Sequence, residues 1–101
     1  MECYFVITTY IDKNKDTNAY DEYIKLVKPM VESYGGKYIV RTNDVESINE
    51  KWNPDRLIII KFPSRDALDN CFGSDEYKKI MSKRESSVDA RAIIVGGCGN
   101  E

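Results

Sequence analysis

Short apolar runs rich in β-branched and aromatic residues predict four strands. The two longest are residues 3–11 (Cys-Tyr-Phe-Val-Ile-Thr-Thr-Tyr-Ile) and residues 56–62 (Arg-Leu-Ile-Ile-Ile-Lys-Phe), and shorter runs occupy 37–42 and 90–95. Residues of these types favour strands. Because successive side chains of a strand point to opposite faces of its sheet, the unbroken apolar rows predict strands that are covered on both faces.

Between the first two strands, apolar residues recur every three or four positions, which is the period of a helix with one buried face. Either Asp16 or Thr17 can cap the start of this helix. Its apolar stripe consists of Tyr20, Tyr23, Ile24, Val27, Met30 or Val31, and Tyr34. Gly35 and Gly36 follow, and we expect them to form a left-handed C-terminal cap and the turn into the next strand.

A second helical region follows the third strand and is divided in two. Ser64 can cap its first part, Gly73 interrupts it, and Ser74 starts a further helix. The order of elements is therefore β-α-β-β-α-β. This order predicts one α+β domain over residues 1–101, with the ferredoxin-like arrangement and a four-stranded antiparallel sheet. We expect residues 96–101 to form a loose tail.

Both faces of the predicted sheet are apolar, yet helices on one side can cover only one of them. Four strands about 4.8 Å apart and about five residues long leave a bare face on the order of 300 Å². An apolar patch of that size indicates a partner. We therefore expect a homodimer in which the sheets of two subunits pack face to face.

Arg41 lies within the second strand, where alternation predicts Tyr38 and Val40 on one face and Ile39 and Arg41 on the other. An arginine among buried neighbours needs an anionic or hydrogen-bonding partner. Two kinds of partner would serve. One is an Asp or Glu in a structural ion pair near a sheet edge, and the other is an anionic group of a ligand.

Composition narrows the classes of function. The chain has 101 residues, a net charge of -2, three cysteines and no histidine. Without clustered basic residues or histidine, we expect no nucleic-acid binding, no zinc site and no Ser-His or Cys-His catalysis. The apolar runs are too short to span a bilayer, and the odd number of widely spaced cysteines fits reduced thiols. These features predict a cytoplasmic protein with no cofactor, metal or membrane partner.

Several short motifs together resemble the family known as domain of unknown function 1330 (DUF1330), within the dimeric α/β-barrel superfamily. The motifs are Tyr34-Gly35-Gly36-Lys37-Tyr38 with Val40-Arg41, Trp52-x-Pro54-x-Arg56-Leu57, Phe62-Pro63-Ser64, and Ser74-x-Glu76-Tyr77 followed by Arg84. The resemblance covers residues 3–95. It implies a barrel formed by the sheets of two subunits, and no established activity. Superfamily relatives include cofactor-independent monooxygenases, small isomerases and haem-degrading enzymes, but a likeness of fold transfers no chemistry.

Seven residues are candidates for contacting a ligand, because they are arginines with a need for an anionic partner or aromatic residues with a polar tip. They are Arg41, Trp52, Arg56, Tyr20, Tyr38, Tyr77 and Arg84. Each also has a structural interpretation. The arginines can form ion pairs or favour a helix dipole, the tyrosines can belong to the core, and Trp52 can pack over the rim of a dimer.

Two hypotheses for the function remain open. In the first, a cleft between sheet and helices, with Arg41, Trp52 and a tyrosine, binds a small flat or acidic organic ligand and turns it over without a cofactor or only binds it. In the second, the protein is a non-catalytic structural or regulatory interaction module, and the same arginines and Trp52 are interface groups. An RNA-recognition module would need aromatic residues on the third strand, where this chain has aliphatic ones.

Overall fold

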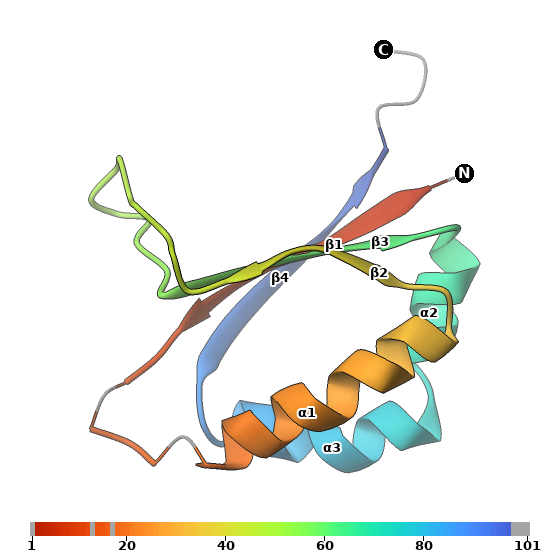
Figure 1. The fold of residues 1–101 in the computed structure, drawn as a ribbon, viewed down its shortest axis with the longest axis horizontal. Coiled ribbons are helices and arrows are strands. Elements are labelled where there is room, and N and C mark those ends of the chain that lie inside the picture. Colours follow the sequence, from red (N-terminus) through yellow and green to blue (C-terminus); the bar gives the residue numbers. More distant parts are fainter. Residues whose placement is uncertain (1, 13, 17, 98–101) are drawn as a thin grey trace.

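A four-stranded antiparallel sheet with three helices on one of its faces forms the protein, seen in a computed structural model that describes residues 2–12, 14–16 and 18–97 (Figure 1). The elements are β1 (Cys3–Tyr10), α1 (Asn18–Ser33), β2 (Lys37–Thr42), β3 (Arg56–Phe62), α2 (Arg65–Phe72), α3 (Asp75–Glu85) and β4 (Asp89–Gly96). The strand order is β2-β3-β1-β4. This is the predicted ferredoxin-like arrangement, with the two most apolar strands at the centre.

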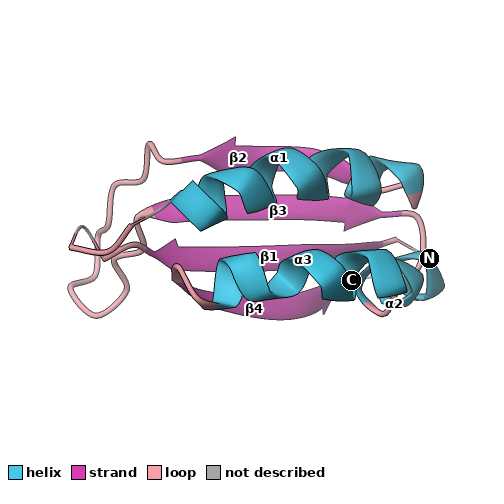
Figure 2. Cartoon of the chain, turned by 90° about the horizontal axis from the view of Figure 1, so that it is seen from below, coloured by secondary structure: helices cyan, strands magenta, loops and turns pink. Residues whose placement is uncertain are grey.

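The core lies between the sheet and the helices, because that is where the apolar stripes of the helices meet the inward side chains of the strands. α1 and α3 run side by side across the sheet, and α2 lies at its end (Figure 2). Phe62 and Val31 are fully buried in this layer. The remaining buried apolar residues are Cys3, Tyr20, Tyr23, Val27, Ile58, Ile60, Leu68, Cys71, Tyr77 and Ile80.

The predicted limits of α1 follow from its capping residues. The Asp16 carboxylate accepts a hydrogen bond from the backbone amide of Asn18 at 2.9 Å; Thr17, the other predicted cap, lies outside the described residues. At the C-terminal end, Gly35 has φ +88°, and the amide of Gly36 donates to the carbonyl of Val31 at 2.9 Å. This left-handed cap is confirmed.

The division of the second helical region is also confirmed. The Ser64 hydroxyl accepts from the amide of Ala67, and the Ser74 hydroxyl accepts from the amide of Tyr77, each at 3.1 Å. Gly73 ends α2. The two short helices can therefore pack at different angles on the sheet, since a capped break separates them.

The predicted alternation in β2 is wrong, because the strand contains an irregularity. Tyr38 and Val40 pair with successive residues of β3, so Ile39 is one extra residue in β2. A β-bulge of this kind reverses the facing of the residues that follow it. Tyr38 and Arg41 therefore lie on the helix side of the sheet, and Val40 lies on the opposite side.

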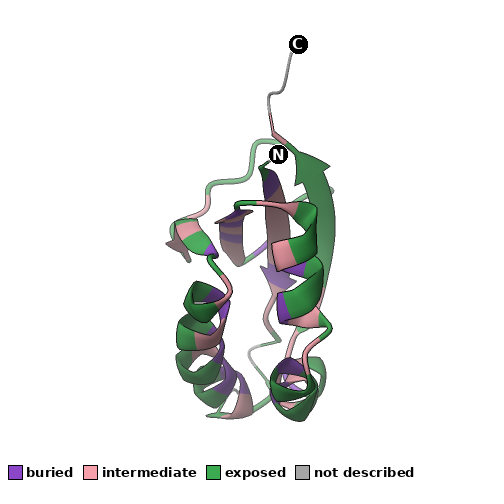
Figure 3. Cartoon of the chain, turned by 90° about the vertical axis from the view of Figure 1, so that its right-hand side faces the viewer, coloured by how far each residue is buried: buried purple, intermediate pink, exposed green. Residues whose placement is uncertain are grey.

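The other face of the sheet, which we call the open face, is covered by no helix or strand of the described residues (Figure 1). The strand pairing places Tyr4, Val6, Val40, Leu57, Ile59, Ile93 and Val95 on it. Ile93 is 60% exposed, and Figure 3 shows β4 exposed along nearly its whole length. No helix in the described part of the chain is long and apolar enough to cross a membrane.

Two segments differ from their predicted extent. β4 continues through Gly96, where the tail was expected to begin, and the amide of Gly97 donates to the carbonyl of Glu2 at 3.2 Å. The rest of the predicted tail, residues 98–101, lies outside the described residues. Residues 43–55 form a long connection between β2 and β3, which we call the β2–β3 arm.

Candidate functional site

The three candidate arginines all lie on the helix side of the sheet. Arg41 pairs across the strands with Ile58, and Arg56 pairs with Thr9, and both of these partners are buried against the helices. Arg84 belongs to the last turn of α3 and lines hollows beneath β1. The bulge in β2 is what brings Arg41 to this side of the sheet.

Three hollows follow one another between the sheet and the helices. The outer cleft, about 240 Å³, is bordered by Tyr20, Asp21, Arg56 and their neighbours. Tyr20 also borders a middle cavity of about 30 Å³. Arg84 and Tyr23 border both the middle cavity and an inner cavity of about 60 Å³. A cavity needs roughly 10 to 15 Å³ to hold one water molecule. The two smaller cavities thus suit a few waters or a small polar group.

The outer cleft combines a guanidinium with a carboxylate. Nη1 of Arg56 donates to Oδ1 of Asn43 at 2.8 Å, but its buried Nε has no acceptor among the described residues. Asp21, from the first turn of α1, is the one carboxylate among the described residues that line the three hollows. The cleft can therefore accept a ligand that carries both a hydrogen-bond acceptor and a donor.

Arg41 supports the wall of the outer cleft. Its Nη2 donates to the backbone carbonyl of Ile24 at 3.1 Å, and Ile24 lines the cleft. The guanidinium carbon also lies 5.1 Å from the centre of the Tyr38 ring, a cation–π contact. A carbonyl and an aromatic ring, neither of them an anion, are thus the partners of Arg41 that the structure shows.

The inner cavity contains a pair of hydrogen-bonded tyrosines. The hydroxyl oxygens of Tyr23 and Tyr77 are 3.0 Å apart. Burial, together with the neighbouring Tyr77, raises the pKa of Tyr23 well above its usual value. Arg84 lines the same cavity, and its buried Nε has no acceptor in the described part of the chain. Small side chains on β4, including Ala92, leave the space open.

Tyr38 and Cys71, two titratable groups of this layer, are poor bases and poor nucleophiles at neutral pH. Burial raises the pKa of Tyr38 to about 12. Burial and the charge of Glu76 raise the pKa of the Cys71 thiol to about 11. Neutral phenols and a neutral thiol donate hydrogen bonds but do not abstract protons. The arrangement is therefore suited to binding an anionic or acceptor-rich group between guanidinium and phenol donors.

The structure brings together most of the predicted site residues but separates Trp52 from them. Arg56, Tyr20, Tyr38, Tyr77 and Arg84 line the three hollows. Trp52 instead lines a hollow of about 260 Å³ within the β2–β3 arm, which Arg41 does not reach. The expectation that Arg41 and Trp52 share one cleft is therefore not met, because the arm projects on the side of the sheet opposite the helices (Figure 1).

Sequence reasoning missed several residues that line the hollows. Tyr23 lines the middle and inner cavities but is not among the seven candidates, since its helical spacing matches that of ordinary core residues. Asn43 and Asp21 carry no signal that distinguishes them from solvated polar residues. The alternate small residues Ala90 and Ala92 border the inner cavity. Small residues at every second position of an edge strand leave room on one face of the sheet. This pattern could have indicated the inner cavity.

Comparison with known proteins agrees with this fold. A family model described as "Domain of unknown function (DUF1330)" matches residues 3–98. The structure of RPA0582 from Rhodopseudomonas palustris, a protein of unknown function, is similar with a TM-score of 0.81 and 18% identity, over 95% of this chain and 82% of that one. No curated protein matches the sequence.

Two other solved structures are similar at lower identity. A variant of SnoaB, a cofactor-independent oxygenase from Streptomyces nogalater, has a TM-score of 0.71 and 9% identity, over 98% of this chain and 95% of that one. A dimeric ferredoxin-like protein of unknown function from Jannaschia sp. CCS1 has a TM-score of 0.73 and 9% identity, over 96% of this chain and all of that one (100%). Likeness at this level of identity shows the fold alone.

Proposed function

Because the chain belongs to the DUF1330 family, whose description names no activity, we propose a function from its own geometry: it is a homodimeric protein that binds a small, flat organic acid between the sheet and the helices, without a cofactor. The acid group would accept hydrogen bonds from Arg56 in the outer cleft. The flat part of the ligand would pack beside Tyr20.

The observation that carries this proposal is a pair of buried arginine Nε donors without acceptors. Nε of Arg56 and Nε of Arg84 are both buried, and neither has an acceptor among the described residues. A buried donor without an acceptor costs on the order of 1 to 3 kcal/mol, and more when it is charged. The two arginines border the outer cleft (Arg56) and the inner cavity (Arg84). An acceptor-bearing ligand in the outer cleft would remove that cost at Arg56.

The outer cleft also suits the size and the polarity of such a ligand. Its volume of about 240 Å³ approaches the range of roughly 300 to 1,000 Å³ that is common for small-molecule sites. Arg56 would pair with a carboxylate, and Asp21 in the same cleft would accept from a hydroxyl or amine of the ligand. A hydroxy acid or an amino-substituted aromatic acid combines these groups.

Turnover of the ligand is a further part of the proposal. Guanidinium groups at the outer cleft and the inner cavity could stabilise negative charge that develops on an enolate or phenolate oxygen. The likeness in fold to a cofactor-independent oxygenase is compatible with this chemistry. The raised pKa of Tyr38 disfavours a tyrosinate base at neutral pH. Any proton transfer would then fall to Asp21 or to the ligand itself.

A homodimer is supported by the apolar character of the open face and by a dimeric protein of the same fold. Free thiols at Cys3 and Cys71 fit a cytoplasmic location, which we also propose. The alternative to ligand binding is an interaction module in which the dimer is the functional species. Under that alternative, the arginines would affect assembly rather than ligand affinity.

Ligand binding is tested by thermal unfolding in the presence of a panel of aliphatic and aromatic carboxylates. A ligand at about 100 times its Kd should raise the Tm of a domain of this size by on the order of 10 °C. Arg56→Gln should weaken the effective ligand about tenfold or more, because a charge-assisted hydrogen bond is lost.

The matched control is Arg65→Gln, which removes an exposed arginine paired with Asp69 on α2 and should leave binding unchanged. If no carboxylate raises the Tm, or if both variants lose the same affinity, the proposed site is wrong. If Arg56→Gln changes the dimer dissociation constant and not ligand affinity, the interaction module is the correct alternative.

A further inference from the structure

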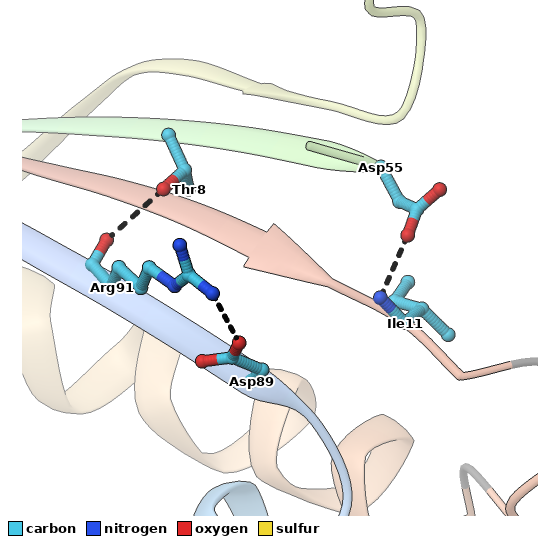
Figure 4. A network of polar contacts seen from close by, with 5 residues as sticks. All are labelled: Thr8, Ile11, Asp55, Asp89 and Arg91. Atoms are coloured by element: carbon cyan, nitrogen blue, oxygen red, sulfur yellow. Dashed lines mark hydrogen bonds and ion pairs between the residues drawn. The ribbon is translucent and has the colours of Figure 1, made fainter. Parts of the chain in front are cut away.

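The β2–β3 arm extends beyond the sheet and is held at its base. In Figures 1 and 2 it projects past the ends of the strands, on the side of the sheet away from the helices. At its C-terminal end, the amide of Asp55 donates to the carbonyl of Thr9 at 2.9 Å. The Asp55 carboxylate accepts from the amide of Ile11 at 2.7 Å (Figure 4). At its N-terminal end, Asn43 accepts from Arg56.

The arm carries two large apolar side chains that are exposed to solvent. Ile48 is 94% exposed and Trp52 is 60% exposed. Between them lies the hollow of about 260 Å³, bordered also by Val45, Pro54 and Leu57. Leu57 is at the same time a residue of the open face. The apolar surface of the arm is therefore continuous with that of the open face.

We propose that the β2–β3 arm clasps a second copy of this chain, with Ile48 and Trp52 packed against the partner subunit and an apolar side chain of the partner in the hollow. The inference rests on the homodimer of the proposed function and extends it, because it assigns the arm to the interface. In a two-fold dimer the arm of each subunit would contact the same surface of the other subunit. The two contacts would be equivalent by symmetry, so both arms would be covered.

The area of the interface supports this assignment. Strands of six to eight residues with a rise of about 3.3 Å and a spacing of about 4.8 Å give an open face of roughly 450 Å². Two such faces give roughly 900 Å² of flat area, whereas a standard-size interface buries about 1,600 Å² of accessible surface in total. A tryptophan alone can bury about 150 to 250 Å². Two arms that each contribute Trp52 and Ile48 would make up much of the difference.

Trp52 is a reporter for this contact, since the chain has a single tryptophan. The experiment measures its emission maximum while the protein is diluted from the dimer to the monomer, with mass followed by light scattering. We expect emission at a shorter wavelength in the dimer, where the indole is covered, and a shift to longer wavelength on dissociation. Ile93→Glu, which puts a charge on the open face, should give a monomer with the long-wavelength emission at every concentration.

A variant of the arm tests the contribution of the tip to assembly. Ile48→Glu should raise the dimer dissociation constant about tenfold or more, because a charge would be buried in the contact. The matched control is Leu26→Glu on α1, the same chemical change at an aliphatic side chain that is 45% exposed. It should leave the dimer dissociation constant within about twofold.

Three results would overturn the inference. They differ in whether they also contradict the homodimer. If Trp52 emits alike in dimer and monomer, the arm is not part of the interface, but the dimer stands. If Ile48→Glu and Leu26→Glu dimerise equally well, the same conclusion follows for the tip of the arm. If the unmodified protein is a monomer at micromolar concentration, both the dimer and the clasp are wrong, while ligand binding by Arg56 is still judged by its own assay.

Discussion

At the level of single residues, the paired hydroxyls of Tyr23 and Tyr77 illustrate how a polar group is tolerated in this core. Each phenol gives the other a hydrogen-bonding partner in the buried layer between the sheet and the helices. From the sequence alone, Tyr23 and Tyr77 are predicted only to be buried, each on its own helix. The pairing depends on how α1 and α3 lie against each other, and spacing along the chain does not contain that information.

The pair predicts coupled effects on stability. Tyr23→Phe or Tyr77→Phe leaves one buried hydroxyl without its partner and should lower the free energy of unfolding by about 1 to 3 kcal/mol. The double variant should lose clearly less than the sum of the two, because neither hydroxyl then remains unpaired. Urea denaturation of the unmodified protein, the two single variants and the double variant measures this double-mutant cycle. Strict additivity would show that the two hydroxyls do not depend on each other.

The raised pKa of Tyr38 predicts a loss of stability at high pH. Its folded pKa of about 12 lies above the ordinary tyrosine value of 10.0, so the unfolded chain releases the proton first. The contribution is fully present below about pH 10 and is lost as the pH rises through about 12. Tyr38→Phe should flatten this part of the stability profile, measured by urea unfolding at stepped pH. An unchanged slope in the variant would contradict the assignment.

At the level of elements, helix ends were predictable and strand facing was not. Caps such as Ser74 act within a few residues of the chain, so the local sequence determines them. The bulge at Ile39 inserts one residue into a regular alternation and changes the side on which Arg41 lies. Nothing in the residues of β2 marks that insertion. The facing of one candidate site residue was therefore predicted incorrectly, although the strand itself was identified.

The cap of α3 gives a prediction at this scale. Ser74→Ala removes the acceptor of the Tyr77 amide and should lower the free energy of unfolding by about 1 kcal/mol. Ser82→Ala, at an exposed position inside the same helix, should leave stability unchanged or slightly higher, because alanine is the better helix former. Chemical denaturation compares the two variants. Equal effects would mean that the cap does not hold the start of α3.

At the level of the whole molecule, the sequence predicted the fold and the uncovered sheet face but not the position of the arm. Topology followed from the order of elements, and the apolar character of both faces followed from alternation. The separation of Trp52 from the arginines depends on the course of residues 43–55 through space. A polar loop of this length has no periodic pattern from which its direction could be predicted.

A dimer predicts that thermal stability depends on protein concentration. Folding and association are then one equilibrium, and mass action raises the Tm as the concentration rises. We expect this dependence for the unmodified chain and its absence for Ile93→Glu, measured by calorimetry over a hundredfold range of concentration. A Tm that stays constant for both proteins would mean that the open face is not paired in solution.

Arg56 connects the outer cleft with the β2–β3 arm. It begins β3, at the point where the β2–β3 arm ends, and it donates to Asn43 at the opposite end of the arm. A ligand that draws the guanidinium away from Asn43 would change how the base of the β2–β3 arm is held, and with it the contact that we propose between the arm and a second subunit. Thermodynamic linkage would then be reciprocal. If the acid changes the dimer dissociation constant by some factor, dimer formation changes the affinity for the acid by the same factor.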